Sequence, residues 1–287
     1  MKKLLIIGRG FLGNTIANVA KTKQVQVFEA SQNSGILLDI KKIKTIEDTI
    51  LEIDPDIIIN CSAITDVDKI EEESKNAFEV NAYGVQNISK LSEKYSKRFI
   101  HISTDSIFDG ENGWYNENDR PNPINQYSKS KLKGEELIIK NNSNAVIIRT
   151  NFYGYNNEGK FLFNWILKNL RCKKPINAFE DIIFNPLEIN NLSELILELS
   201  LSKFKGLIHL TGNEIFTKYE FIKKIALTLD YDINLVMKGN SKQVNFIAER
   251  PKNTSLDNSL VKKILNTKIK TLEEWLKENY SEYSKID

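Results

Sequence analysis

Residues 4–13 read LLIIGRGFLG, and this stretch decides which fold the chain can adopt. Its first four residues form a short apolar run, as in a β-strand that is covered on both faces. Its last six follow the pattern G-x-G-x-x-G, and a helical pattern of apolar side chains then runs over residues 11–21. A dinucleotide-binding turn requires this order of strand, turn and helix, because glycines let the backbone approach a pyrophosphate at the helix N-terminus. The residues expected to contact the cofactor here are Gly8, Arg9, Gly10, Phe11, Leu12 and Gly13.

The alternation of strand and helix patterns continues to residue 150. Strand-like apolar runs lie at 25–28, 56–60, 99–103 and 145–149, with helical spacing at 44–53, 71–78, 84–95 and 127–140. Strands that alternate with helices predict parallel pairing through right-handed crossovers. We therefore expect an α/β fold: a Rossmann-type, doubly wound parallel sheet with a smaller C-terminal substrate-binding part.

The second half of the chain has a less regular pattern. Helices are predicted at 160–170, 218–229 and 271–280, and a strand at 206–210. We expect residues 1–151 to form the dinucleotide-binding Rossmann domain and residues 152–287 to be mostly the substrate-binding domain, with segments near 183–210 returning to the first. No internal repeat or flexible linker separates the two parts, so the second is expected to pack directly on the sheet.

Composition excludes several classes of protein. The 287 residues include 40 Lys+Arg and 38 Asp+Glu, and a net charge of +2 does not suit a protein that mainly grips nucleic acid or anionic lipid. Two cysteines, Cys61 and Cys172, supply no disulfide framework. No apolar run approaches the roughly 18 residues that span a bilayer. The apolar run after Lys2 and Lys3 is too short for a secretory signal. A cytoplasmic protein without membrane or nucleic-acid partners is expected.

The adenosine end of the cofactor is expected near Glu29, which lies 21 residues after Gly8 at the end of the second strand. A carboxylate there typically binds the ribose 2′-hydroxyl and favours NAD. Basic residues nearby could instead serve the 2′-phosphate of NADP, namely Arg9, Lys21 and Lys23. The choice between NADP and NAD therefore stays open. Asp39 and Ile40 close the predicted third strand, where a carboxylate could meet the adenine amino group.

A candidate reducing centre has the pattern Y-x-x-x-K at Tyr127 and Lys131. Residues four apart share one face of a helix, so the Lys131 ammonium is expected to stabilise a tyrosinate and lower the pKa of Tyr127. Such a tyrosine can protonate a carbonyl oxygen while hydride reaches the carbon. Tyr127 and Lys131 are also expected to contact the cofactor, and the lysine can bond the nicotinamide ribose. Thr104 follows the strand at 99–103 and could orient that carbonyl. A second copy of the pattern, residues 219–223, is expected to serve helix packing.

Taken together, these residues resemble the extended short-chain dehydrogenase/reductase superfamily, and most closely its dTDP-4-dehydrorhamnose reductase family. Besides the Tyr and Lys, the resemblance depends on AITDVDKIE at 63–71, STDSIFDG at 103–110, RT at 149–150 and RPKNTSLD at 250–257, and it covers most of the chain. It implies a catalytic triad of Thr104, Tyr127 and Lys131, with Asn60 and Ala63 near the nicotinamide. The substrate contacts that it implies are Thr65, Val67, Thr104, Asp105, Ser106, Phe152 and Arg250.

The reaction implied by this resemblance is the reduction of a nucleotide-linked 4-keto-6-deoxy sugar by NAD(P)H, as in dTDP-L-rhamnose synthesis. The expected partner is a nucleotide sugar, with a homodimer left open. The glycine turn is one residue shorter than the family's G-x-x-G-x-x-G, and Ser106 and Phe152 replace the usual Tyr and Trp. Where some members carry carboxylates for magnesium, this chain has Thr15 and residues 190–191 (NN), so no metal is expected.

Other functions compete with reduction. Ser106 stands where a sugar 4,6-dehydratase would carry its acid–base Glu, which disfavours dehydration. An NAD-dependent C4 epimerase uses the same triad and stays open. The regulatory subunit of methionine adenosyltransferase resembles the same family and is a non-catalytic alternative, although an intact triad favours catalysis. Lys-rich patches at 41–42 and 129–133 are expected to be solvated helix faces rather than a nucleic-acid surface.

Overall fold

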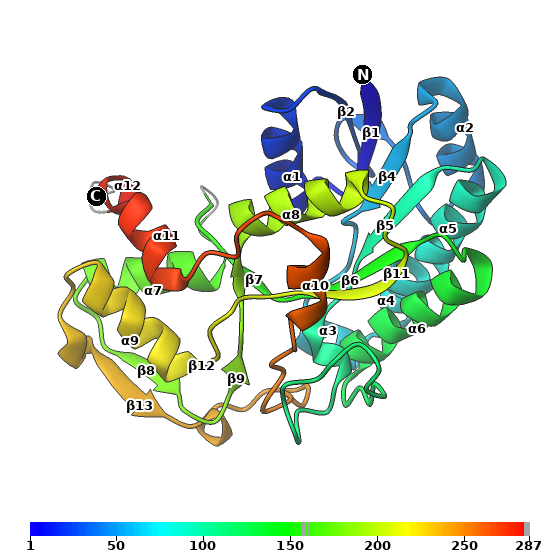
Figure 1. Cartoon of the computed structure of the whole chain (residues 1–287). Helices are drawn as coiled ribbons and strands as arrows, with labels where there is room; N and C mark the ends of the chain where they lie inside the picture. Colours follow the sequence, from blue (N-terminus) through cyan, green and yellow to red (C-terminus); the bar gives the residue numbers. More distant parts are fainter. Residues whose placement is uncertain (157–158, 160, 284–287) are drawn as a thin grey trace.

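The computed structural model describes residues 1–156, 159 and 161–283, and its centre is a seven-stranded parallel sheet (Figure 1). The strand order is β11-β6-β5-β4-β1-β2-β3. The strands are β1 (Lys2–Ile7), β2 (Val25–Ser31), β3 (Ile36–Leu37), β4 (Ile57–Asn60), β5 (Arg98–Ile102), β6 (Val146–Thr150) and β11 (Gly206–Leu210). The predicted α/β fold with a doubly wound parallel sheet is confirmed.

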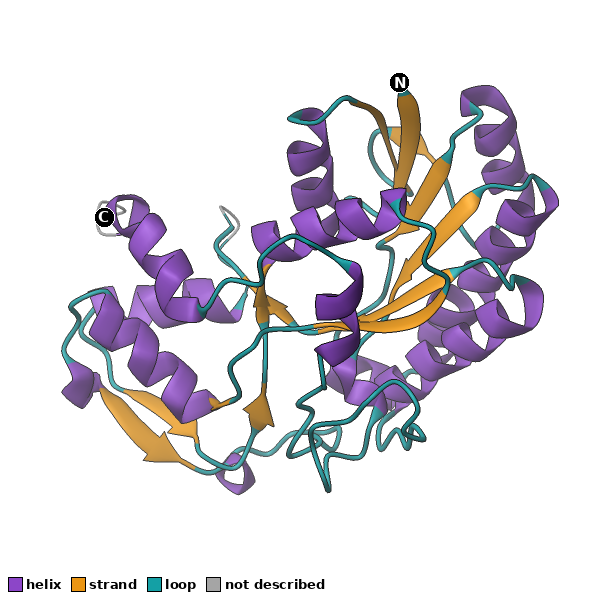
Figure 2. Ribbon diagram, in the orientation of Figure 1, coloured by secondary structure: helices purple, strands orange, loops and turns teal. Residues whose placement is uncertain are grey.

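Helices cover both faces of the sheet (Figures 1 and 2). One layer consists of α1 (Phe11–Lys21), α8 (Ile189–Leu201) and α10 (Ser259–Ile264), and the other of α2 (Ile43–Ile53), α5 (Val85–Lys94) and α6 (Gln126–Asn141). Successive residues of β1 serve the two layers, because strand side chains alternate: Leu4 packs with the first and Leu5 with the second. This two-sided burial explains why the strands are apolar throughout.

The remaining elements of the first half surround the carboxyl ends of the strands. They are α3 (Val67–Glu72), α4 (Lys75–Phe78), the π-helical turn η1 (Glu79–Gly84) and the 3-10 turn η2 (Asp105–Ile107). Helix α3 begins earlier than the sequence predicts, because the Asp66 carboxylate accepts a hydrogen bond from the Lys69 backbone N–H at 3.2 Å and caps it. Strand β3 is shorter than predicted, and residues 39–40 lie in the turn that follows it.

A second lobe is built on residues after β6. It contains β7 (Phe152–Tyr153), α7 (Leu162–Arg171), β8 (Ile176–Phe179), β9 (Ile183–Phe184), β10 (Leu187–Glu188), β12 (Phe216–Thr217), α9 (Lys218–Thr228), η3 (Ile233–Leu235), β13 (Val236–Gly239), η4 (Ser241–Gln243), α11 (Leu272–Glu278) and α12 (Tyr280–Tyr283). Its core is aromatic, with Phe163 and Trp275 at 5.3 Å between ring centroids. Between the second-lobe segments the chain returns to the first lobe as α8 and β11, so the lobes are interleaved. The division into a cofactor-binding and a substrate-binding domain stays a prediction.

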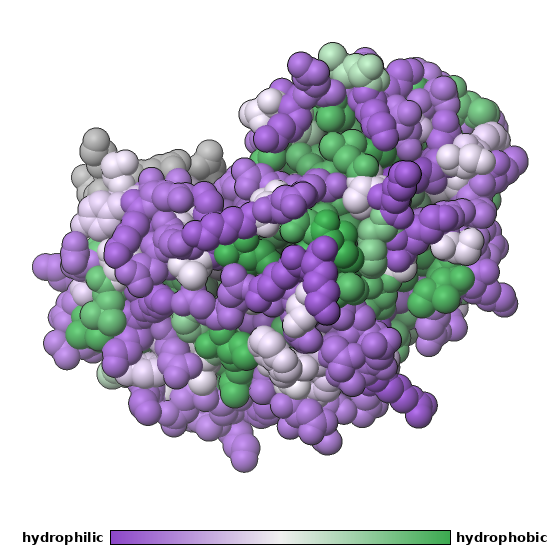
Figure 3. Space-filling model, viewed as in Figure 1, coloured by the Kyte–Doolittle hydropathy of each residue, from purple (hydrophilic) through white to green (hydrophobic). Residues whose placement is uncertain are grey.

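The surface is polar over most of the face shown in Figure 3, as expected for a chain with 27% charged residues. None of the helices in the described ranges is long and apolar enough to cross a membrane.

The glycine turn brings α1 unusually close to β1. Gly8 has a φ of +103°, which an L side chain rarely adopts, and a Cβ added to Gly13 would lie 1.9 Å from the Gly8 carbonyl oxygen. The Gly10 position is open, with no atom within 4 Å of an added Cβ. Gly13 therefore serves close strand–helix packing, and Gly10 does not.

We expect Gly13→Ala to lower the free energy of unfolding by about 1–3 kcal/mol, because the backbone must move apart to admit the methyl group. The matched control, Gly10→Ala, should cost less than about 1 kcal/mol. Chemical denaturation monitored by circular dichroism measures both. Equal stability of the two variants would contradict this account of the turn.

Candidate functional site

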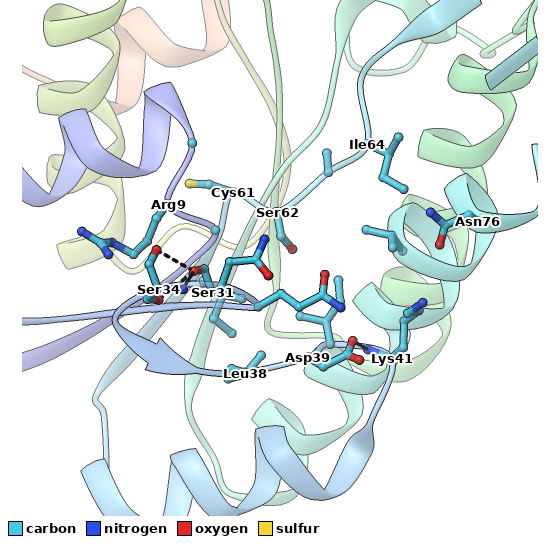
Figure 4. Close-up of a pocket in the computed structure, with 18 residues that line it drawn as sticks. Arg9, Ser31, Ser34, Leu38, Asp39, Lys41, Cys61, Ser62, Ile64 and Asn76 are labelled. Atoms are coloured by element: carbon cyan, nitrogen blue, oxygen red, sulfur yellow. Dashed lines mark hydrogen bonds between the residues drawn. The ribbon is translucent and has the colours of Figure 1, made fainter. Parts of the chain in front are cut away.

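A cavity of about 550 Å³ opens at the carboxyl ends of β1, β2 and β4, where parallel sheets bind ligands. The glycine turn, the segment after β2 and the segment after β4 form its walls, and Figure 4 shows Arg9 and Ser34 at one side and Asn76 at the other. The residues predicted for the cofactor that line it are Gly8, Arg9, Gly10, Asp39, Ile40 and Ala63. These residues come from separate parts of the chain, and the fold brings them together.

Other residues predicted for the cofactor do not line this cavity, namely Phe11, Leu12, Gly13, Glu29, Asn60, Tyr127 and Lys131. The Glu29 carboxylate accepts hydrogen bonds from Lys21 Nζ at 2.9 Å and from Arg9 Nε at 3.4 Å. Two cations therefore bind the Glu29 carboxylate. The residues that line the cavity on this part of the chain are instead 31–34. The sequence analysis did not predict the polar side chains of residues 31–34 as cofactor contacts. Their position after the end of a predicted strand could have indicated such a role.

Helix α6 presents the predicted general acid at its first turn. The Asn125 side chain caps the helix by accepting a hydrogen bond from the Ser128 N–H at 2.9 Å, and the Glu71 carboxylate accepts one from the Gln126 N–H at 2.8 Å. Tyr127 follows, and its hydroxyl shares a hydrogen bond with Thr104 at the end of β5. The structure therefore brings together two members of the predicted triad that are far apart in sequence.

The electrostatics of the triad differ from the sequence prediction. Burial raises the pKa of Tyr127 to about 12, and the hydrogen bond with Thr104 only partly opposes this shift. The Lys131 ammonium does not offset it, because it donates to the Ile102 carbonyl at 2.7 Å. The prediction that Lys131 lowers the pKa of Tyr127 therefore does not describe this structure. Burial also lowers the pKa of Lys131 to about 8, against the attraction of Glu135.

A buried polar chain that sequence reasoning missed connects Lys131 to the first cavity. Lys131 Nζ lies 3.4 Å from His101 Nε2, and His101 Nδ1 lies 3.1 Å from the Asn60 amide nitrogen. The Asn60 amide oxygen accepts hydrogen bonds from the backbone N–H and the hydroxyl of Ser62, which lines the cavity. Burial and the neighbouring Lys131 keep the pKa of His101 well below its usual range, so the ring is neutral. The feature of the sequence that could have indicated this polar chain is a histidine among the apolar residues 99–102 (FIHI).

A buried ion pair anchors α6 to the sheet. Arg149 Nη2 lies 2.7 Å from a Glu135 carboxylate oxygen, and the Ser103 hydroxyl donates to the other oxygen. The Arg149 guanidinium also lies 5.3 Å from the centroid of the Phe108 ring. Both charges are almost fully buried, with side-chain exposures of 4% and 1%. Removing one partner would leave the other uncompensated, so this pair holds α6 in one position.

A second cavity, of about 240 Å³, lies between the lobes next to Thr104. Its lining residues are Asp105, Ser106, Asn151, Phe179, Ile182, Phe184, Lys218, Phe246, Arg250, Pro251 and Thr254. Three of the predicted substrate residues, Asp105, Ser106 and Arg250, are among them. The others do not line it, namely Thr65, Val67, Thr104 and Phe152. The Phe152 ring packs at 6.4 Å against Phe11.

Two carboxylates tie the second lobe to the first around this cavity. Asp68 of α3 accepts hydrogen bonds from the Ala248 N–H at 2.9 Å and from Arg250 Nη2 at 2.8 Å. Asp105 accepts from the Thr254 hydroxyl at 2.6 Å and from the Asn151 amide at 2.8 Å. Across the described ranges, no three His, Cys, Asp or Glu residues are grouped so that they could hold a metal ion.

Comparisons with known proteins agree with this geometry. The family described as RmlD substrate binding domain matches residues 1–285. The chain is 31% identical over 255 residues to the probable low-salt glycan biosynthesis reductase Agl14 of Haloferax volcanii, covering 86% of this chain and 85% of that protein. It is 27% identical to the dTDP-4-dehydrorhamnose reductase of Aggregatibacter actinomycetemcomitans, covering 90% and 91%.

A solved structure is similar over nearly the whole chain. It is that of the dTDP-4-dehydrorhamnose reductase of Bacillus anthracis in complex with NADP, with a TM-score of 0.90 and 27% identity. The match covers 98% of this chain and 100% of that one.

We expect Gly10→Val to weaken dinucleotide binding by about tenfold or more, because its side chain would project into the first cavity where the backbone is otherwise accessible. Folding should be little affected, since the position is open. Fluorescence titration with NADH and NADPH measures the affinity, and circular dichroism reports the fold. Unchanged affinity in a folded variant would show that the turn does not contact the dinucleotide.

Proposed function

From the premise that the chain belongs to the RmlD substrate binding domain family, we propose that it is an NAD(P)H-dependent reductase of a nucleotide-linked 4-keto-6-deoxy sugar. The observation that carries this proposal is the hydrogen-bonded pair of Thr104 and Tyr127, with Lys131 buried against the Ile102 carbonyl and a cavity that begins at Asp105, directly after Thr104. The proposed reaction is that of the dTDP-4-dehydrorhamnose reductases to which the chain is similar.

The first cavity suits a dinucleotide. Helix α1 begins after Gly10 with no side-chain cap, so no capping side chain occupies its first N–H groups. These groups and the positive end of the helix dipole would hold the pyrophosphate. Asp39 would meet the adenine, and Ala63 would lie towards the nicotinamide. When bound, NADPH or NADH supplies hydride to the carbonyl carbon of the sugar.

The three residues of the triad have different proposed roles in the transfer of a proton to the carbonyl oxygen. Tyr127 keeps its proton at neutral pH because of its high pKa, and it donates that proton to the carbonyl oxygen. Thr104 orients the same oxygen by a hydrogen bond. To stabilise the tyrosinate that remains, the charged Lys131 would turn from the Ile102 carbonyl, to which it donates in this structure, towards Tyr127 when substrate and cofactor are bound. The caps supplied by Asn125 and Glu71 hold the first turn of α6 in place for this step.

We expect Tyr127→Phe to lower kcat by about 10²–10⁴-fold, because it removes the proton donor and keeps the ring. Cofactor affinity should stay close to that of the unaltered chain. Nicotinamide absorbance with a dTDP-4-keto-6-deoxyhexose, in separate reactions with NADH and NADPH, measures turnover and identifies the cofactor. The matched control is Tyr219→Phe, in the second Y-x-x-x-K copy, which should behave as the unaltered chain. Near-normal turnover of Tyr127→Phe would rule out this tyrosine as the acid.

The pKa of Lys131, about 8, predicts a pH dependence. Its ammonium is charged below that pH and neutral above it, so kcat at saturating substrate should be constant at lower pH and fall by about tenfold per pH unit above 8. Lys131→Met should reduce the rate and abolish this decline at high pH. A profile of the unaltered chain that stays flat well beyond the pKa would show that Lys131 charge is not required.

A further inference from the structure

Lys218, the first residue of α9, points into the second cavity. Its Nζ lies 3.1 Å from the centroid of the Phe184 ring, and both residues line the cavity. Within the ranges that the structure describes, Lys218 takes part in no ion pair within 4.0 Å. The family resemblance assigned no role to this residue. A cation enclosed by aromatic rings and without a counter-ion is costly unless a ligand supplies the opposite charge.

The carboxylate that shares the cavity is already satisfied. Asp105 accepts hydrogen bonds from Thr254 and Asn151 at one oxygen, and from the Thr104 and Ser106 hydroxyls at the other, both at 3.2 Å. Its attraction for Lys218 is weaker than the effect of burial, which lowers the pKa of that lysine to about 7. Asp105 is therefore a positioning group at the sugar end of the cavity and not the ion-pair partner of Lys218.

A second cation lines the same cavity with an unused donor. Arg250 Nη2 binds Asp68, but Arg250 Nη1 is buried and has no hydrogen-bond partner among the described residues. The guanidinium lies 5.0 Å from the centroid of the Phe246 ring. Buried donors are normally paired, so this one also indicates a ligand oxygen.

We propose that Lys218, together with Nη1 of Arg250, binds the diphosphate of a nucleoside-diphosphate sugar, and that Lys218 makes the enzyme selective for that substrate class. The inference rests on the proposed reductase function. It adds the residue that recognises the anionic part of the substrate.

The position of the cavity fits this assignment. Asp105 and Ser106 follow Thr104 directly, so the cavity begins beside the group that orients the C4 carbonyl. The diphosphate is attached at C1, across the sugar ring from C4. An anion site therefore has to lie about one sugar ring away from Thr104, and Lys218 and Arg250 line the same cavity as Asp105 and Ser106. Arg250 would bind the diphosphate while Asp68 holds its other nitrogen.

The proposal also predicts a linked proton. The diphosphate of a nucleotide sugar has no titration near neutral pH, whereas free Lys218 is partly neutral there. The bound anion would restore the charged form, so the chain should take up a fraction of a proton when it binds a nucleotide sugar near pH 7.

The experiment is isothermal titration calorimetry of the full chain with dTDP-glucose, which carries the diphosphate but lacks the reactive ketone. We expect Lys218→Met to weaken binding by about tenfold or more. The matched control is Lys223→Met, on the same helix with its Nζ 5.6 Å from the centroid of the Tyr219 ring but outside this cavity, and it should bind normally. Affinity for NADPH and NADH should be unchanged in both variants.

Titrations in buffers of different ionisation enthalpy measure the linked proton. The unaltered chain should take up a fraction of a proton, Lys218→Met should take up none, and Lys218→Arg should retain much of the affinity without proton uptake. A merely structural role for Lys218 would not produce this pattern.

Several outcomes would overturn the proposal: equal affinity of Lys218→Met and the unaltered chain for dTDP-glucose, proton uptake that persists in Lys218→Met, or no binding of either dTDP-glucose or UDP-glucose by the unaltered chain. Failure of the reductase function is distinguishable from these. If the chain reduces no keto sugar but still binds dTDP-glucose through Lys218, the diphosphate site is supported and the reductase function is not.

Discussion

The buried ion pair between Arg149 of β6 and Glu135 of α6 is the interaction on which the site depends most. It joins the helix that carries Tyr127 and Lys131 to the sheet, and the Ser103 hydroxyl extends it to the end of β5. Loss of one partner from such a pair commonly costs about 3–5 kcal/mol, so α6 has little freedom to shift.

Two cavities lie at the carboxyl ends of the strands, and different chemical groups line them. The first cavity is built from backbone, because glycines and a free helix N-terminus present N–H groups rather than side chains. The second is built from aromatic rings and cations of the second lobe, with Lys218 above Phe184. Asp68 and Asp105 tie the lobes together around it.

Local sequence patterns predicted many of the helices and strands in the first half of the chain. The helix predicted for residues 11–21 matches α1, because its start is set by the glycine turn and its face by a helical apolar period. The strands could be predicted from continuous apolar runs, because both faces of the sheet are buried. The second half was less predictable, since its short strands pair with distant segments: β13 with β8, and β9 with β12. Pairing of that kind leaves little local trace in the sequence.

By itself, the sequence determined the parallel sheet, the glycine turn and the identity of Thr104, Tyr127 and Lys131 as candidates for catalysis, because spacing along a strand or helix is a local property. Only the tertiary structure decided the charge environment. It engaged Glu29 with two cations, placed His101 next to Lys131 and kept the pKa of Tyr127 high. In the part of the chain that the structure describes, it also left Lys218 without a counter-ion. Charge and pKa depend on burial and on neighbours that are distant in sequence, and folding alone brings those neighbours together.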